Sequence, residues 1–208
     1  CLDTIKKNEP FFEPHDEHRL MINVSRGPLS IYAEIFEGKL EPTIIIADFP
    51  LKWTVRGMDR LYEMGINAIV TSQRVIPEQI MDPKVKNRSR MFYMMANIEV
   101  SKHKGNNNWA LMLDPDDYIA EGSGANFFMV KDGTLYTPEP RNILVGISRG
   151  YVFELAEKLG FEYKEKNLKI DDALNADEAF VTGTPFAMLP ITKINGKSVG
   201  DGKKGPIY

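Results

Sequence analysis

The apolar residues of this chain are grouped in short runs that alternate with segments of helical spacing. Runs of strand length cover residues 20–24, 44–47, 68–71, 110–113, 125–130 and 179–182. Between them, apolar side chains recur with a helical period over residues 58–64, 91–100 and 152–159. Because strands and helices alternate along the chain, the sequence predicts a mixed α/β (α+β) fold.

Turn-forming residues separate these segments. Gly65, Gly105 and Gly160 follow the helical segments, where glycine commonly ends a helix. The pairs Asp132-Gly133 and Asn195-Gly196 favour tight turns between antiparallel strands. The sequence therefore predicts one hairpin from residues 125–130 to 135–136 and another within residues 191–199.

Charge and hydropathy exclude several classes of protein. The net charge is -3 and the 26 basic residues are scattered, so we expect no nucleic-acid partner. The apolar runs are too short to cross a bilayer, so we expect no membrane partner and a cytoplasmic location. A single cysteine, Cys1, fits a reducing compartment.

The first residues have the character of an incomplete element. The chain starts at Cys1 without an initiator methionine, and residues 2–8 have the pattern of the end of an amphipathic helix. We therefore interpret the sequence as a fragment of a longer protein.

A polar segment near the start of the chain combines imidazoles with carboxylates, which together can complete the coordination shell of a metal ion. Prolines flank the segment, so a solvated loop is the favoured interpretation and no metal site is predicted. The residues concerned are His15, His18, Glu13, Asp16 and Glu17.

Four segments, taken in order, resemble the fold-type-IV pyridoxal-phosphate enzymes. They are Lys86 within residues 85–90, the run 121–126 (Glu-Gly-Ser-Gly-Ala-Asn), residues 146–149 (Gly-Ile-Ser-Arg) and Gly183-Thr184. This class IV family includes branched-chain amino acid aminotransferase, D-amino acid transaminase and aminodeoxychorismate lyase. The resemblance runs from about residue 25 to residue 206, and the run from Glu121 to Asn126 is its most specific part.

The resemblance implies a D-amino acid aminotransferase-like fold of two domains. Residues 1–50 would be the remainder of a smaller N-terminal domain, which is incomplete, and residues 51–208 would form the larger domain that binds pyridoxal 5'-phosphate. Active sites completed by a partner chain imply a homodimer.

Lys86 is the residue that the resemblance assigns to catalysis and to covalent attachment of the cofactor. Its amine would form a Schiff base with the cofactor aldehyde and would then move a proton at the substrate alpha carbon. A lone lysine is usually a solvated surface residue, and only the position of Lys86 before Arg88 and Arg90 singles it out. Lys84 is the alternative lysine.

The remaining cofactor-binding residues are assigned in the same way. Glu121, in the run that ends at Asn126, would face the pyridine nitrogen and keep it protonated. A turn carboxylate is the alternative interpretation of Glu121. Gly146, Ile147 and Ser148 would place N–H groups at a helix start for the phosphate, although Ser148 could equally be a helix cap. Gly183 and Thr184 would supply a second phosphate contact.

Two positions depart from the family pattern. The residue after Thr184 donates a backbone N–H to the substrate carboxylate in branched-chain enzymes, but Pro185 has no N–H. The aromatic residue that follows the lysine in those enzymes falls on Met91, with Phe92 and Tyr93 offset. Substrate identity therefore does not follow from the sequence.

Three functions remain open. The leading prediction is transfer of an amino group between an amino acid and a 2-oxo acid. The second is aminodeoxychorismate lyase activity, which releases 4-aminobenzoate and pyruvate, because the lyase carries an arginine at the position of Arg90. The third is a truncated domain that dimerises without catalysis.

Overall fold

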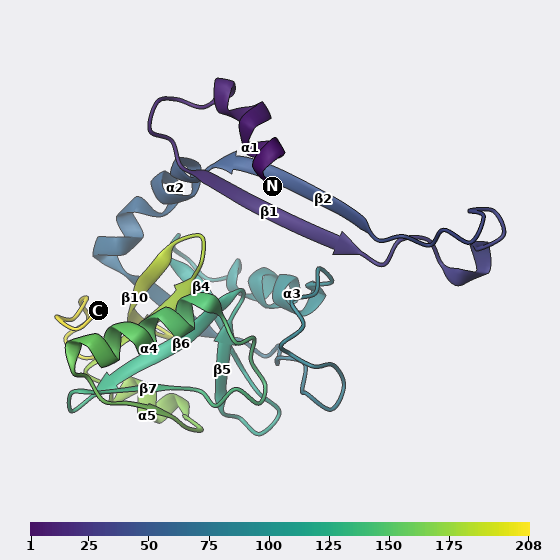
Figure 1. Cartoon of the computed structure of the whole chain (residues 1–208). Coiled ribbons are helices and arrows are strands. Elements are labelled where there is room, and N and C mark those ends of the chain that lie inside the picture. Colours follow the sequence, from purple (N-terminus) through teal and green to yellow (C-terminus); the bar gives the residue numbers. More distant parts are fainter. The chain divides into compact units, whose positions relative to one another are not determined.

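The computed structural model describes residues 1–208, which divide into two compact units, Cys1–Gly57 and Met58–Tyr208 (Figure 1). Helix α2 (Leu51–Met64) runs across this division. The predicted domain boundary after residue 50 stays a prediction. None of the helices combines the length and the apolar character needed to cross a membrane.

The first unit is built around an antiparallel pair of strands. Helix α1 (Leu2–Asn8) and the 3-10 turn η1 (Glu9–Phe11) precede β1 (His18–Ser25), and the turn η2 (Ser30–Tyr32) lies between β1 and β2 (Thr43–Pro50). The register pairs His18 with Pro50 and Ser25 with Thr43. The strands predicted over residues 20–24 and 44–47 are therefore confirmed.

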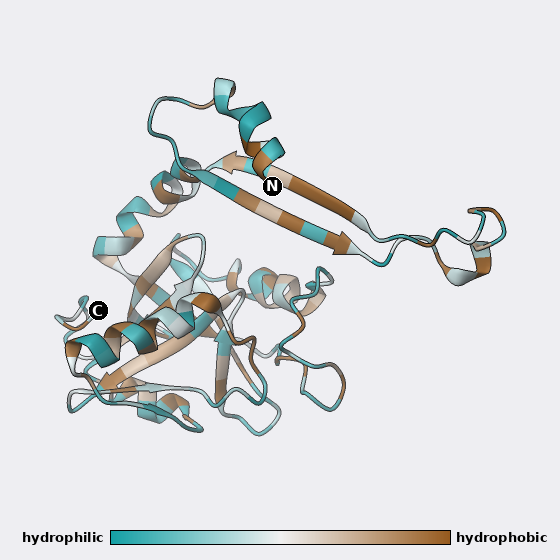
Figure 2. Cartoon of the chain, viewed as in Figure 1, coloured by the Kyte–Doolittle hydropathy of each residue, from teal (hydrophilic) through white to brown (hydrophobic).

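Both strands of this hairpin carry hydrophobic residues (Figure 2), and several of their side chains are exposed. Ile22, Val24, Ile44 and Ile45 are each more than half exposed, between 54% and 66%. Apolar strands left open in this way are surfaces that another element or chain can cover.

His18 differs from the expectation of a solvated loop. It is the first residue of β1, its Nδ1 lies 2.8 Å from Asp48 Oδ2, and its Nε2 lies 2.9 Å from Glu9 Oε2. The hydrogen bond to Asp48 raises the pKa of His18. His15 lies in an exposed turn, and no cluster of three or more His, Cys, Asp or Glu side chains is placed to hold a metal ion.

The second unit contains a sheet of nine strands in which a ring of six closes on itself. Neighbours around the ring are β3, β4, β5, β6, β9 and β10, with β10 returning to β3. Their bounds are β3 Ile66–Val70, β4 Asn108–Leu113, β5 Ile119–Gly122, β6 Ala125–Lys131, β9 Glu178–Gly183 and β10 Ala187–Ile194. Closure leaves these strands without free edges.

The other elements of this unit flank the ring. Strands β7 and β8 extend the sheet from β6, and β11 pairs with β10. These elements are α3 Met91–Val100, β7 Thr134–Thr137, α4 Ile147–Leu159, β8 Tyr163–Glu165, α5 Ile170–Leu174 and β11 Lys197–Ser198.

Alternation along the strands explains why the predicted apolar runs are continuous. Leu111 of β4 and Phe127 of β6 belong to one buried cluster, whereas Met112 and Phe128 face two other clusters. Successive side chains of a strand point to opposite faces, so a strand buried on both faces needs apolar residues throughout. The apolar runs over residues 110–113 and 125–130 meet that need.

The predicted turns are confirmed by the backbone. Asn195 and Gly196 both have positive φ, 49° and 79°, and they join β10 to β11. Gly160 ends α4 with φ 77°, as glycine does at many helix C-termini. The sequence predicts neither β5, β8 nor α5, which are short and lack a clear apolar period.

Candidate active site

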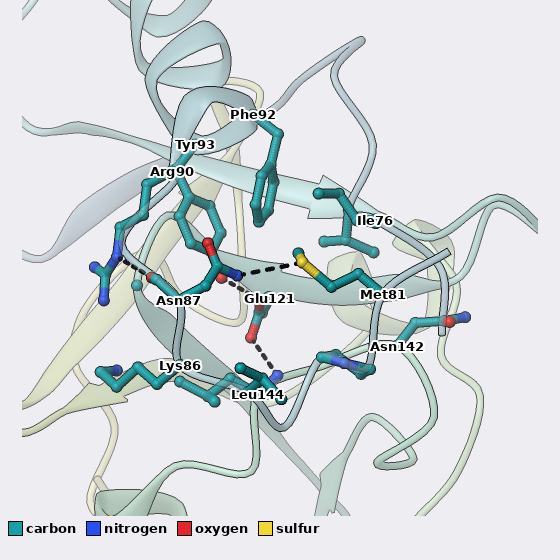
Figure 3. A pocket seen from close by; sticks show the side chains of 14 residues that line it. Ile76, Met81, Lys86, Asn87, Arg90, Phe92, Tyr93, Glu121, Asn142 and Leu144 are labelled. Carbon is teal, nitrogen blue, oxygen red and sulfur yellow. Dashed lines mark hydrogen bonds between the residues drawn. The ribbon is translucent and has the colours of Figure 1, made fainter. Parts of the chain in front are cut away.

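A small pocket that is open to solvent lies in the second unit, where the segment between β3 and α3 faces β5. Its lining includes Lys86, Arg90, Tyr93, Glu121 and Leu144 (Figure 3). Two of the predicted site residues, Lys86 and Glu121, therefore share one pocket although they are far apart in sequence.

Lys86 lies on the segment before α3, outside any helix or strand, and its side chain is exposed. It forms no ion pair, and partial burial lowers the pKa of its amine below the ordinary lysine value. The positive charge of Arg90 lowers this pKa further, whereas Glu121 opposes the change. An amine whose pKa is lowered is more available as a nucleophile. Lys84 does not line the pocket.

Glu121 lies within β5 rather than in a turn, and it is only 5% exposed. The Tyr93 hydroxyl donates a hydrogen bond to Glu121 Oε1 at 2.5 Å, and the Leu144 N–H donates to Oε2 at 3.0 Å. Burial raises the pKa of Glu121 to about 7, and the two hydrogen bonds oppose that change. Burial, together with the Glu121 charge, also raises the pKa of Tyr93.

Asn126 supports this carboxylate from behind instead of lining the pocket. It pairs with Glu121 across the β5–β6 hairpin, and its Nδ2 donates to Leu144 O at 2.8 Å. A Cβ atom on Gly146 would lie 2.2 Å from Asn126 Oδ1, so position 146 accepts only glycine without rearrangement. Asn126 thus binds the carbonyl oxygen of the same residue, Leu144, whose N–H binds Glu121.

The predicted phosphate-binding residues lie at one end of β6, outside the lining of this pocket. Gly146 is the extended N-cap residue of α4, and Ile147 and Ser148 begin the helix. Thr182 pairs with Asn126 in the β6–β9 register, and Gly183 and Thr184 follow it directly. Asn126 therefore lies between the two segments. Ser148 lines a separate apolar groove.

A polar network holds the two segments that border the pocket. Asn142 Nδ2 donates to the buried Asp114 at 2.9 Å, and its Oδ1 accepts from the Glu78 N–H at 3.2 Å. Arg141 also donates to Asp114, at 3.1 Å. The segment that carries Lys86 is therefore tied to the segment that carries Leu144.

The aromatic residues at the start of α3 lie closer to the pocket than Met91 does. Met91, on which the family's aromatic position falls, is 61% exposed and lies outside the pocket lining. Phe92 and Tyr93 both line the pocket instead. The helical spacing of Tyr93 with the buried Ala96 and Val100 is a signal in the sequence that Tyr93 faces inward. Leu144 has no such signal, since it acts through its backbone.

The fold and this pocket define a class of enzyme. The class IV amino-transferase family matches residues 1–194, and the chain belongs to it. The predicted mixed α/β architecture of fold-type-IV enzymes is confirmed by likeness to solved branched-chain amino acid aminotransferases. The enzyme of Escherichia coli has a crystal structure that matches with a TM-score of 0.83 and 31% identity, covering 100% of this chain and 66% of that one.

Other relatives agree. The branched-chain-amino-acid aminotransferase of Escherichia coli (strain K12) is 31% identical over 214 residues, which cover 100% of this chain and 64% of the relative. The branched-chain amino acid aminotransferase from Thermobaculum terrenum, in its PLP form, matches with a TM-score of 0.80 and 27% identity, covering 99% of this chain and 64% of that one. This chain thus spans less than two thirds of the length of the curated Escherichia coli relative.

Proposed function

We propose that this chain carries the pyridoxal 5'-phosphate site of an aminotransferase for branched-chain amino acids, with Lys86 as the lysine that holds the cofactor. One observation carries the proposal. The only lysine in the pocket lining shares that pocket with a carboxylate that is 5% exposed. An exposed lysine of lowered pKa is suited to attachment, and a buried carboxylate is suited to a cationic ring nitrogen.

The residues of the chain fit this cofactor. Gly124 lines the pocket, and a Cβ built there would make only one contact, with Arg90 Nη1 at 3.9 Å, so the backbone is accessible from the pocket at this position. Asn87 lines the pocket, and its Oδ1 is buried without a hydrogen-bond partner. A hydrogen-bond donor on a bound group would satisfy this oxygen. The start of α4 offers N–H groups to a phosphate.

Each residue has a distinct task in transamination. When bound, the cofactor supplies the electron sink that makes the substrate alpha proton acidic. Lys86 would remove and return that proton. Glu121 would hold a positive charge at the ring nitrogen, and Tyr93 and Leu144 would keep the Glu121 carboxylate oriented. The Asn126 side chain would act on Glu121 through Leu144.

The substrate class is proposed from the names of the relatives, which are branched-chain amino acid aminotransferases. Leucine, isoleucine and valine with 2-oxoglutarate are therefore the first substrates to assay. We also propose that the protein acts as a homodimer, which sedimentation velocity of the purified chain would test.

The deciding experiment is reduction with borohydride after incubation with pyridoxal 5'-phosphate, followed by peptide mass spectrometry. We expect the reduced adduct on Lys86. An adduct on Lys84 would move the role to that residue, and complete absence of an adduct would favour a domain that dimerises without catalysis. A Lys84→Ala variant, which should still give the Lys86 adduct, is the matched control.

A lyase function has one observation in its favour, which is that Arg90 lines the pocket beside Lys86. Incubation of the cofactor-loaded chain with aminodeoxychorismate separates the two functions. Release of 4-aminobenzoate without amino-group transfer to a 2-oxo acid would overturn the aminotransferase proposal.

A further inference from the structure

Arg90 has no acidic partner, although it lines a pocket. It is the N-cap residue of α3, and it forms none of the ion pairs of the chain. Its only hydrogen bond runs from Nε to Asn87 O at a long 3.5 Å. A guanidinium has five N–H donors in a fixed planar arrangement. The terminal donors of Arg90 therefore have no hydrogen-bond partner within the chain.

Other arginines of this unit show the contrast. Arg74 and Arg141 are paired with aspartates at 2.5 and 3.1 Å, and the buried Arg149 is paired with Glu165. Each of these three arginines has a carboxylate partner within the chain. Arg90 is the arginine that lines the pocket. The carboxylate whose pKa its charge lowers is Glu121, which forms no ion pair with Arg90 and already accepts hydrogen bonds from Tyr93 and Leu144.

The balance of charge in the pocket favours an anion. Its titratable cations are Lys86 and Arg90, and its only carboxylate, Glu121, is already bonded by Tyr93 and Leu144. In Figure 3 the side chains of Lys86 and Arg90 both extend to the left of the view, whereas Glu121 lies at the centre. The cationic groups thus gather on one side of the pocket, where an anion gains most.

The surroundings of Arg90 leave few other donors. Its Nη1 lies 3.9 Å from the position of a Cβ on Gly124, and the Gly124 carbonyl oxygen lies 3.4 Å from the position of a Cβ on Gly183. The turn that follows Gly183 contains Pro185, which has no N–H. The guanidinium of Arg90 and the amine of Lys86 are the cationic donors that line the pocket.

We propose that Arg90 binds the carboxylate of the amino-acid and 2-oxo-acid substrates. The inference rests on the proposed function, in which both substrates carry a carboxylate on the carbon next to the reacting one. A guanidinium binds a carboxylate through two parallel hydrogen bonds, which fixes orientation as well as charge. Because the carboxylate is common to both substrates, one arginine serves both halves of the reaction.

Contacts within the chain suit Arg90 to this role. Its guanidinium carbon lies 5.9 Å from the centre of the Tyr93 ring. Arg90 is also the N-cap residue of α3, so its side chain starts at the N-terminus of that helix. The ring face favours a nearby cation, and the helix N-terminus favours an anion in front of it. Arg90 is thus a substrate-binding residue that sets the position of the alpha carbon relative to Lys86.

The test compares two probes of the same shape on the cofactor-treated full chain by isothermal titration calorimetry. The probes are 4-methylpentanoate, which is leucine without its amine, and the uncharged 4-methylpentanamide. We expect Arg90→Met to weaken binding of the acid by at least about tenfold, which is equivalent to about 1.4 kcal/mol. Binding of the amide should change by less than about twofold, and Arg90→Lys should recover part of the acid affinity.

Arg88→Met is the matched control, because Arg88 is exposed and lies outside the pocket lining. It should bind the acid within about twofold of the parent. The inference is overturned if the parent does not prefer the acid, if Arg90→Met keeps its acid affinity within about threefold, or if it loses both probes equally.

Peptide mapping of Lys86 on the same preparations separates this inference from the proposed function. A Lys86 adduct together with an unchanged Arg90→Met variant refutes the carboxylate site alone. Acid binding that depends on Arg90, in a chain that forms no adduct, refutes the aminotransferase proposal alone.

Discussion

Glu121 and Lys86 belong to the same pocket but are held in opposite ways. Glu121 lies on a strand of the closed ring, is 5% exposed and accepts hydrogen bonds at 2.5 and 3.0 Å. Lys86 is exposed on an irregular segment and its side chain has no partner in the chain. A carboxylate fixed by the core therefore faces an amine that is free to move.

This contrast suits the task that the proposed function gives to each group. A charge that orients and polarises a bound ring is most effective when its surroundings are rigid and dry. An amine that attaches to the cofactor, leaves it and carries a proton has to change position during each turnover. We call Glu121 the floor of the pocket and Lys86 its rim. Substitutions at the floor and at the rim should have different effects.

The largest effect is expected at the rim. Lys86→Ala should lower transamination by about 10⁴-fold or more, because covalent attachment and proton transfer are both lost. Stability should change by less than about 0.5 kcal/mol, since the side chain is exposed and unpartnered. Steady-state rates and urea denaturation measure the two quantities. Lys84→Ala is the control, and substantial activity in Lys86→Ala would assign catalysis to another residue.

At the floor, Glu121→Gln should slow turnover while the cofactor still binds. The substitution keeps the size of the side chain but removes its charge, and loss of one member of a buried charge pair costs about 3 to 5 kcal/mol. If most of this cost falls on the transition state, the rate drops by about two to four orders of magnitude. A variant within about threefold of the parent, with an unaltered cofactor spectrum, would exclude this role for Glu121.

The same substitution should also change how stability depends on pH. The folded pKa of Glu121 is raised from 4.5 to about 7, so the folded state holds this proton more tightly than the unfolded chain. Stability of the parent, relative to Glu121→Gln, should therefore fall as pH rises from about 4.5 through 7, by up to about 3 kcal/mol. Urea denaturation between pH 5 and 8 measures the difference. Parallel curves for the two proteins would contradict the burial of this carboxylate.

The smallest effect is expected at Tyr93, which joins the floor to α3. Tyr93→Phe removes the hydrogen bond at 2.5 Å that lowers the pKa of Glu121, so that pKa should rise above about 7. A hydrogen bond to a charged group contributes about 1.5 to 3 kcal/mol, which corresponds to about one to two pH units. Carbon-13 NMR of labelled glutamate follows the titration directly. An unchanged midpoint would show that Leu144 alone positions Glu121.

Much of the fold could be predicted because the signals were local. The apolar runs, the helix over Met91–Val100 and the Asn195-Gly196 turn each reflect spacing or backbone preference within a few residues. Strand β5 could not be predicted in that way. Its residues 119–122 have little intrinsic strand preference, and they are extended because β4 and β6 pair with them on both sides.

The residues of the site also fall into those that the sequence indicated and those that only the folded chain revealed. Lys86 and Glu121 were singled out by their order in the chain, and the pocket contains both. Tyr93 and Leu144 were missed as partners of Glu121, because a hydroxyl on α3 and a backbone N–H in a distant loop reach it only in the folded chain. The unpaired state of Arg90 was equally invisible, since it depends on which carboxylates the fold brings near.

The sequence by itself determined most of the longer elements, the turns and the family resemblance, and it singled out the side chains that are proposed to react, because these signals depend on neighbours along the chain. Only the tertiary structure decided that Glu121 is buried, that Lys86 is exposed and that Arg90 lacks an acidic partner. Burial and charge pairing, which set the pKa and the free donors of each group, arise from residues that are distant in sequence and close in space.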